Sequence, residues 1–210
     1  MKRFLYFVAI IIIASCKKED SNSNLDLNRG LLEGYLYSNP KIIVQKTTYS
    51  SISYDQYYST YRGYVFSPSQ DIKISAIGGR IAGFGTFKIE IYRGWTSDRD
   101  TLLIDSININ NTSIFQYKNI NRDLILKANE EYLIRYFNIN HNFVFDAGLG
   151  YGSDATNILQ FPLIIKDIKI LSPYYMYLNL YNGNYYTVDE GIWFGGILRG
   201  LVDFKYELTK

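Results

Sequence analysis

The chain has 210 residues, and its 22 lysines and arginines nearly balance its 20 aspartates and glutamates, for a formal net charge of +2. A chain so close to neutrality lacks the basic surface that displaces counterions from nucleic acid, so we expect no nucleic-acid partner. The single cysteine and the single histidine exclude a disulfide within the chain and a zinc site made of these residues. One domain with a sizeable core is expected at this length.

The first residues have the pattern of an export signal. Lys2 and Arg3 precede an apolar run at residues 4–14, and the small residues Ala14 and Ser15 stand directly before Cys16. The apolar run is shorter than the roughly 20 residues that cross a hydrocarbon core. A short membrane anchor or a buried helix is the alternative, but length and flanking residues favour a signal peptide at residues 1–15.

The tetrapeptide IASC at residues 13–16 resembles the lipobox of bacterial lipoproteins. This resemblance implies cleavage before Cys16, acylation of that cysteine and anchoring in a membrane by the acyl chains. Each methylene buried in the membrane contributes about 0.8 kcal/mol to such an anchor. The cluster KKED at 17–20 resembles the export signals of Bacteroidota lipoproteins, which implies the outer membrane and exposure at the cell surface. We therefore expect a signal peptide at 1–15, a lipidated cysteine and polar tether at 16–28, and a single domain at 29–210.

The folded region begins with segments that favour strands. We expect the first strands at 31–37 and 42–49, followed by a tyrosine-rich loop or edge strand at 50–61. The clearest pattern lies between residues 64 and 93, where Phe87, Ile89 and Ile91 alternate with more polar residues. A period of two places one set of side chains on a dry face and the other on a wet face. We therefore predict that these three residues point into the core, whereas Lys88, Glu90 and Tyr92 face outward.

The rest of the chain continues as short strands separated by turns. Residues 94–100 and the glycine-rich residues 148–152 are expected to be a loop and a turn, and Asn182-Gly183 is a strong hairpin signal. In the last strand we expect Phe204 inside and Asp203 outside. The further strands are expected at 102–109, 114–117, 124–126, 132–139, 143–145, 163–171, 174–181, 185–188, 193–197 and 201–208. This many short strands without an amphipathic helix predict an all-β protein, either a two-sheet sandwich or a barrel.

Three segments taken together resemble a known type of module. The order GYVFSPSQDIKISAIG, FKIEIYRG and LILKANEEYLIRYF is similar to that of jelly-roll β-sandwich modules of unknown function in secreted bacterial proteins. The resemblance covers about residues 64–137, with a matching end at 204–208. It implies an antiparallel two-sheet β-sandwich that serves as an accessory domain at the cell surface, not an enzyme.

The sequence offers little for catalysis. Nucleophilic catalysis of the Ser/His/Asp type needs a histidine beside the nucleophile, and the only histidine, His141, stands in an expected turn. Two carboxylate pairs, Asp98 with Asp100 and Asp189 with Glu190, are the residue types of a glycosidase or, for the first pair, of a calcium site. Neither pair has a spacing that specifies such a site, so we expect no enzyme activity, no cofactor and no metal.

Binding through aromatic side chains remains the leading hypothesis. Trp95 lies in a polar loop beside Arg93, Asp98 and Asp100, and an exposed ring there would stack on a sugar while its neighbours bind hydroxyl groups. The alternative is that Trp95 folds back onto the core, as tryptophan is mostly buried. Trp193 is expected in the core. A second aromatic platform would come from Tyr57, Tyr58, Tyr174, Tyr175, Tyr185 and Tyr186, although a tyrosine-rich edge is also simply structural.

Two functions from different classes follow from these residues. The first is a non-catalytic glycan-binding module with its site at Trp95, Arg93, Asp98, Asp100, Tyr174 and Tyr175. The second is a structural or protein-interaction lipoprotein, because tyrosine and tryptophan are also enriched in protein interfaces. A compact site where polar groups converge on Trp95 would favour the first, and a broad tyrosine patch on a sheet face would favour the second.

Overall fold

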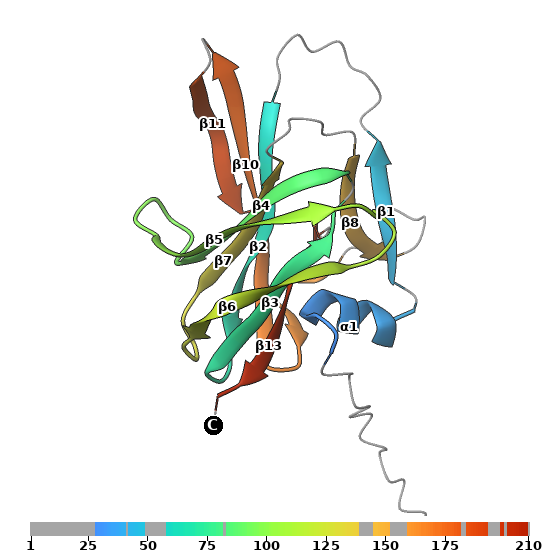
Figure 1. Ribbon diagram of the computed structural model, residues 1–210, viewed down its shortest axis with the longest axis vertical. Coiled ribbons are helices and arrows are strands. Elements are labelled where there is room, and N and C mark those ends of the chain that lie inside the picture. Colours follow the sequence, from blue (N-terminus) through green and yellow to red (C-terminus); the bar gives the residue numbers. More distant parts are fainter. Residues whose placement is uncertain are drawn as a thin grey trace, which may run out of the picture.

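The fold is that of an all-β protein in which antiparallel sheets pack face to face, as the computed structural model shows (Figure 1). The structure describes residues 28–40, 42–48, 58–81, 83–138, 145–151, 159–181, 184–192, 198–199 and 201–209. The expected all-β sandwich is therefore confirmed. The expected signal peptide, Cys16 and the tether up to residue 27 lie outside the described residues.

The larger sheet runs through the whole molecule in the strand order β11-β10-β2-β7-β4-β5, with β9 attached to β10. All of its pairs are antiparallel. Strand β7 lies in the middle of the sheet, between β2 and β4, and its residue Ile134 is opposite Tyr64 of β2 and Ile91 of β4. Its strands are β2 (Tyr58–Pro68), β4 (Gly85–Arg93), β5 (Asp100–Ile109), β7 (Tyr132–Asn138), β9 (Leu163–Ile165), β10 (Ile168–Tyr181) and β11 (Asn184–Ile192).

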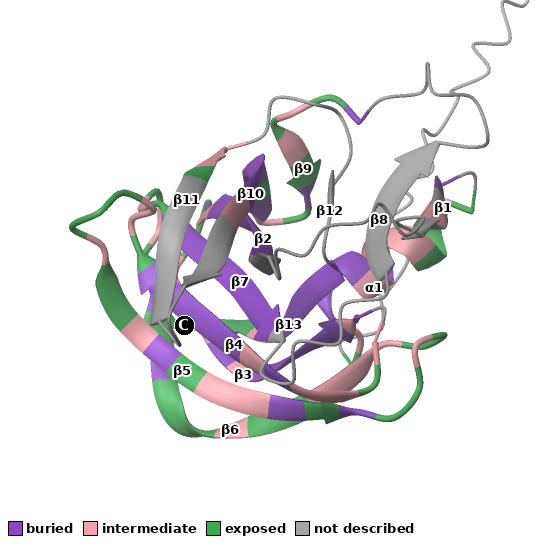
Figure 2. Cartoon of the chain, turned by 90° about the horizontal axis from the view of Figure 1, so that it is seen from above, coloured by how far each residue is buried: buried purple, intermediate pink, exposed green. Residues whose placement is uncertain are grey.

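The smaller sheet covers one face of the larger one and encloses the core. It consists of β13 (Leu201–Leu208), β3 (Ile72–Arg80) and β6 (Gln116–Leu126), in that order. Phe66 of the larger sheet and Phe204 of the smaller sheet meet across the core with ring centroids 5.0 Å apart. Buried segments of both sheets face this interior in Figure 2.

The prediction that one face of β4 points into the core is confirmed. Phe87, Ile89 and Ile91 are 1%, 0% and 0% exposed, and Phe204 is 0% exposed, as predicted. Burying an aromatic or branched aliphatic side chain of this size contributes about 1.5–3 kcal/mol. These four residues therefore belong to the interior that holds the two sheets together.

A third, short sheet lies beside the sandwich. It has the order β1-β8-β12, with β1 (Ile42–Thr48), β8 (Phe145–Tyr151) and β12 (Leu198–Arg199). Ile42 is 5% exposed and belongs to the main core, and Val44 packs against it. The sequence prediction of a turn at 148–152 is wrong for the part that the structure describes, because Gly148 and Gly150 pair with Gln45 and Ile43 inside this sheet.

The first element is a helix, and the prediction of a strand at 31–37 is wrong. Helix α1 (Leu31–Ser38) begins after Gly30 and packs on β13. The carboxylate of Asp203 accepts the backbone N–H groups of Leu32 and Glu33 at 3.0 and 3.1 Å. These are N–H groups that a helix start leaves without an intrahelical partner. The side chain that caps the helix thus comes from the far end of the chain.

Asp203 also contradicts the prediction that it faces solvent, since it is 0% exposed. The prediction that Glu90 and Tyr92 lie on a wet face is wrong as well, because they are 2% and 7% exposed. Both faces of the larger sheet are covered at this point. The alternating pattern correctly placed Glu90 and Tyr92 on the face of β4 opposite to Phe87. It did not show that this second face is also buried.

Other element boundaries differ in detail. Strands expected at 114–117 and 124–126 form one strand, β6, and the strand expected at 163–171 is a hairpin of β9 and β10. In its turn Lys166 adopts the left-handed conformation with φ 52°. The sequence did not indicate this turn because no glycine stands there. The hairpin around Asn182-Gly183 is confirmed by the pairing of Tyr181 with Asn184. The strand expected at 193–197, with Trp193, lies outside the described residues, as does His141.

Candidate functional site

The loop that joins β4 to β5 carries Trp95 and lies at one edge of the sandwich, at the left in Figure 1. Gly94 starts this loop with φ 76°, a left-handed conformation that glycine adopts without a steric penalty. The N–H of Gly94 donates to the carbonyl oxygen of Glu131 at 2.8 Å. This bond ties the start of the loop to the segment that precedes β7.

Trp95 is neither fully exposed nor part of the sandwich interior. Its side chain is half-buried and packs against a set of residues on the outward face of the larger sheet, here called the outer cluster. The outer cluster consists of Tyr61, Val65, Tyr92, Leu133, Phe137 and Tyr174. The indole N–H of Trp95 donates to a carboxylate oxygen of Glu131 at 3.2 Å. The ring is therefore fixed from below by apolar contacts and at its edge by a hydrogen bond.

Arg99 holds the other end of the loop in place. Its guanidinium donates to the carbonyl oxygens of Trp95 and Thr96 at 3.4 and 3.2 Å. The same group forms an ion pair with Glu190 of β11 at 2.6 Å and lies 5.1 Å from the ring centroid of Tyr92. The loop is thus connected to the strand at the opposite edge of the sheet.

Arg135 of β7 is the centre of the outer cluster. Its side chain is 6% exposed and forms an ion pair of 2.7 Å with Glu90, whose side chain is 2% exposed. It also donates to the hydroxyl oxygens of Tyr174 and Tyr92 at 2.8 and 3.2 Å, and it lies 4.0 Å from the ring centroid of Tyr61. A buried ion pair is tolerated when further hydrogen bonds satisfy both charges, and here they do.

These contacts form a continuous chain from the middle of the sheet to the loop. Arg135 donates to the Tyr174 hydroxyl, and that hydroxyl donates to the Glu190 carboxylate, which also accepts from Arg99. Arg99 in turn binds the carbonyl oxygen of Trp95. The backbone of the Trp95 loop therefore rests on a series of charge-assisted hydrogen bonds, which are stronger than neutral ones.

The protonation states fit this arrangement. Burial alone would raise the pKa of Glu90, but the guanidinium of Arg135 and the hydrogen bonds from Lys88, Tyr92 and Arg135 outweigh it and lower that pKa. Burial raises the pKa of Tyr92 and of Tyr174, and the neighbouring carboxylates add to the effect. Glu90 therefore remains ionised while both phenols keep the protons that they donate.

The structure separates the residues that the sequence grouped as a site. Asp98 and Asp100 are exposed in the loop or at its end, and Arg93 is exposed and pairs with Glu130 at 3.2 Å. Tyr174, in contrast, is 1% exposed, so it offers no ring face to a ligand and serves the hydrogen-bond chain instead. Tyr175 points to the other side of β10 and is partly exposed. Arg93 and Asp100 are opposite each other at the ends of β4 and β5, next to the loop that carries Trp95 and Asp98, whereas the buried Tyr174 does not join them.

The sequence did not reveal the residues that hold the loop. Glu131, Arg99, Glu190, Arg135 and Glu90 take part in the contacts above, yet they come from five strands or loops that only the fold brings together. The one local signal was the polar composition around Trp95. The pairing of Arg135 with Glu90, which are opposite each other in β7 and β4, would have required the strand order.

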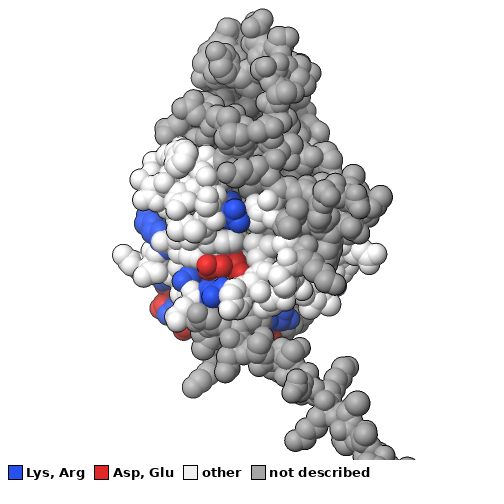
Figure 3. All heavy atoms as spheres, turned by 90° about the vertical axis from the view of Figure 1, so that its right-hand side faces the viewer, with Lys and Arg blue, Asp and Glu red and all other residues white. Residues whose placement is uncertain are grey.

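No other chemistry stands out at this edge. Among the residues that the structure describes, no group of three or more histidines, cysteines or carboxylates is placed to hold a metal ion. In the same part of the chain no helix is long and apolar enough to cross a membrane. On the side of the molecule away from the Trp95 loop, shown in Figure 3, acidic and basic side chains lie next to one another and do not form a field of one sign.

Comparisons of the chain with protein-family models, with curated proteins and with solved structures give no significant match. The proposed binding site therefore rests on the residues and contacts of this chain, and the proposed anchor rests on the lipobox resemblance.

Proposed function

We propose that the protein is a lipid-anchored, non-catalytic binding module of the cell surface that recognises a glycan at the edge of the sandwich formed by the Trp95 loop. One observation carries the proposal: the Trp95 ring is half-buried on the outer cluster, with its N–H bound to Glu131 at 3.2 Å. A large aromatic ring held in one orientation has little rotamer freedom to lose on binding, which favours affinity.

The surroundings of the ring support a sugar as the ligand. Asp98 and Asp100 are exposed on the same loop, and Arg93 is exposed at the end of β4. Carboxylate and guanidinium groups bind hydroxyl groups, while an indole ring stacks on the C–H face of a pyranose. Because Arg99 and Glu190 fix the loop backbone, these polar groups are presented from a rigid base.

The alternative, a protein-interaction surface made of tyrosines, has less support in the described part of the chain. The tyrosines of β2, β4, β7 and β10 whose side chains the structure describes include many that are buried: Tyr61, Tyr64, Tyr92, Tyr132, Tyr136 and Tyr174 are all 9% exposed or less. Burial of these rings removes them from any flat interface. The proposal therefore places recognition at Trp95 and not on a tyrosine face.

A glycan array probed with the full-length protein in detergent tests the proposal. We expect binding to a restricted set of oligosaccharides, loss of that binding in Trp95→Ala, and unchanged binding in Phe84→Ala. Phe84 is the matched control because it is 67% exposed on a different loop. Binding that survives Trp95→Ala, or a protein ligand in the absence of any glycan ligand, would replace the proposal with the interaction function.

A further inference from the structure

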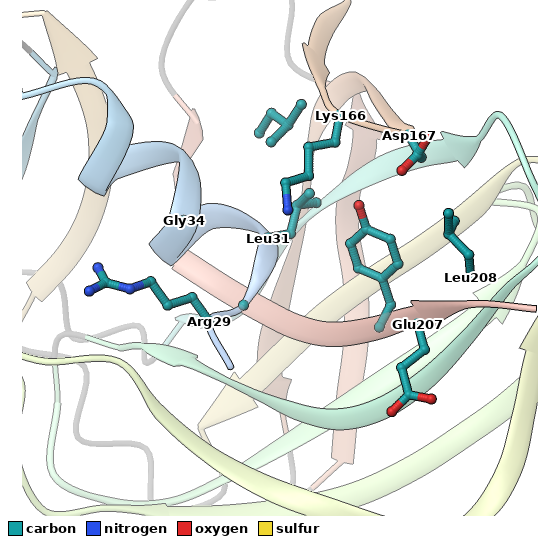
Figure 4. Close-up of a pocket in the computed structure, with 10 residues that line it drawn as sticks. Arg29, Leu31, Gly34, Lys166, Asp167, Glu207 and Leu208 are labelled. Atoms are coloured by element: carbon teal, nitrogen blue, oxygen red, sulfur yellow. The ribbon is translucent and has the colours of Figure 1, made fainter. Parts of the chain in front are cut away.

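A concave site lies at the end of the molecule where the described chain begins. A pocket of about 130 Å³, open to solvent on one side, is lined by the start of α1, the turn between β9 and β10, and the end of β13 (Figure 4). An apolar cavity of about 150 Å³ is known to hold one benzene molecule. This pocket is therefore large enough for a ligand of roughly six non-hydrogen atoms.

The inner wall of the pocket is apolar. Leu31 and Ile165 are each 4% exposed and line it, together with Tyr206 and with Gly30 and Gly34, which bring no side chain. Leu208, which is 47% exposed, lies at the end of β13 and leaves an apolar group next to solvent. A wall of this kind favours the hydrocarbon part of a ligand, since it removes apolar surface from water.

Lys166 supplies a positive charge to the pocket. Within the part of the chain that the structure describes, its ammonium group forms no ion pair and no hydrogen bond. Figure 4 shows its side chain running along the pocket toward Leu31. The left-handed φ of 52° at Lys166 belongs to the tight turn between β9 and β10. The hairpin thus sets where the exposed Lys166 side chain leaves the backbone.

Tyr206 adds a second unsatisfied donor. Its hydroxyl group is buried and donates to no acceptor within the described residues, while the backbone N–H of Asp167 lies near its oxygen and lowers the pKa. Burial and the nearby Asp167 carboxylate raise the pKa of Tyr206 to about 12, so the hydroxyl keeps its proton near neutral pH. A buried O–H group without an acceptor is costly, which makes the Tyr206 hydroxyl a candidate for contact with a ligand or a bound water.

The other charged residues around the pocket are already engaged or point elsewhere. Arg29 lies 3.7 Å from the ring centroid of Tyr37, and Asp167 accepts a hydrogen bond from Gln70 at 3.0 Å. In Figure 4 the carboxylate of Glu207 points away from Lys166. Lys166 is therefore the charged side chain that runs along the apolar wall, with the Asp167 carboxylate near Tyr206 at the same pocket.

We infer that this pocket binds a small carboxylate with a short apolar chain, whose carboxylate pairs with Lys166 and whose chain lies against Leu31 and Ile165. The site is separate from the Trp95 loop and does not depend on the glycan proposal. A ligand of roughly six non-hydrogen atoms corresponds to butyrate. Such a small ligand is expected to bind weakly, with a Kd of about 1 mM.

The experiment is isothermal titration calorimetry of the full-length protein in detergent with acetate, butyrate, hexanoate and octanoate. Butylamine and 1-butanol are the probes that lack the negative charge. We expect the tightest binding for butyrate, weaker binding for the shorter and the longest acids, and no binding of the amine or the alcohol. Titration of the variants in the same detergent cancels the partitioning of the acids into micelles.

Three variants test whether the charge of Lys166 is what binds the acid. Lys166→Asn removes the charge but suits the left-handed conformation, and we expect it to weaken butyrate binding about tenfold. Lys166→Arg and the exposed control Lys169→Gln should leave binding unchanged. Equal affinity of Lys166→Asn and the wild type, tighter binding of butylamine, or no heat with any acid would each overturn the inference.

Discussion

The carboxylate of Asp203 accepts the backbone N–H of Leu32 at 3.0 Å, although 171 positions separate the two residues. The same carboxylate binds the N–H of Glu33 at 3.1 Å and the hydroxyl of Tyr117 at 2.7 Å. Gly30 stands so close to Asp203 and Tyr117 that a Cβ atom there would overlap with both. One buried acid thus fixes the start of the only helix in the described chain to the last strand.

Asp203→Ala should destabilise the protein by at least about 2 kcal/mol, because it leaves two helix N–H groups and the Tyr117 hydroxyl without their acceptor. Urea unfolding followed by circular dichroism measures this change. Asp123→Ala is the control: Asp123 is paired with Lys73 at the surface, with 76% of its side chain exposed, and such pairs contribute less than about 1 kcal/mol. Equal effects of the two substitutions would mean that the cap at Leu32 and Glu33 is unimportant.

The stability contributed by Asp203 should depend on pH. Burial raises its pKa from the ordinary 3.8 to about 6, outweighing the hydrogen bonds that favour the charged form. Since the folded state then binds the proton more tightly than the unfolded state, this contribution is fully present below the unfolded pKa and is lost as pH rises through about 6. The stability gap between wild type and Asp203→Ala should widen by roughly 2 kcal/mol from about pH 7.5 to about pH 4.5.

Comparing two proteins isolates this effect from other titrations. Glu90 has a lowered pKa, so its contribution is present above its unfolded pKa and is lost as pH falls through its folded pKa, but it is common to both proteins. Urea unfolding of both proteins at several pH values between about 4.5 and about 7.5 measures the difference in their free energies of unfolding. A gap that narrows toward acid would show that the hydrogen bonds to Asp203 outweigh its burial.

The core prediction uses three phenylalanines with the same side chain and different burial. Phe87→Ala and Phe204→Ala should each lower the free energy of unfolding by about 3–5 kcal/mol, as expected when a buried phenylalanine is truncated. Phe84 is 67% exposed, so Phe84→Ala should change stability by about 0.5 kcal/mol or less. The denaturation midpoints of the three variants provide the test. Similar midpoints for all three would contradict the assignment of Phe87 and Phe204 to the interior.

Most strands could be predicted from the sequence because their pattern is local. The alternation around Phe87, Ile89 and Ile91 identified a face, and burial confirmed it. Helix α1 could not be predicted in this way, since its run of leucines and tyrosines suits either a strand or a helix and its capping residue is Asp203. Likewise, the charges of Asp203 and Glu90 suggested that both side chains face solvent. Both are buried, because partners from elements distant in the sequence satisfy their carboxylates.

The candidate site was predictable only as far as its exposed loop. Trp95, Asp98 and Arg93 are neighbours in sequence, so their proximity needed no fold. Tyr174 was predicted to expose its ring to a ligand. It is buried instead, because its hydroxyl accepts from Arg135 and donates to Glu190. The polarity of a tyrosine allows both arrangements, and only the order of the strands decides between them.

The anchor remains a prediction from the lipobox resemblance. Cys16→Ala should abolish incorporation of radiolabelled fatty acid and release the protein from the membrane fraction, since the lipid would be its attachment. Ser21→Ala, a change in the polar tether, is the control and should leave both unchanged. A Cys16→Ala protein that still carries label in the membrane would disprove the anchor while leaving the glycan proposal intact.

The central claim is that Trp95 binds a ligand and does not merely fill a space, and Trp95→Ala tests it most directly. Its binding to the best oligosaccharide on the array should be compared with its free energy of unfolding, using Trp95→Phe as the variant that keeps a ring but loses the hydrogen bond to Glu131. Because the ring is half-buried, we expect a stability loss of only about 1–2 kcal/mol. The account predicts that oligosaccharide binding is lost in Trp95→Ala and partly kept in Trp95→Phe. A strongly destabilised Trp95→Ala protein whose folded fraction binds the oligosaccharide with wild-type affinity would contradict it.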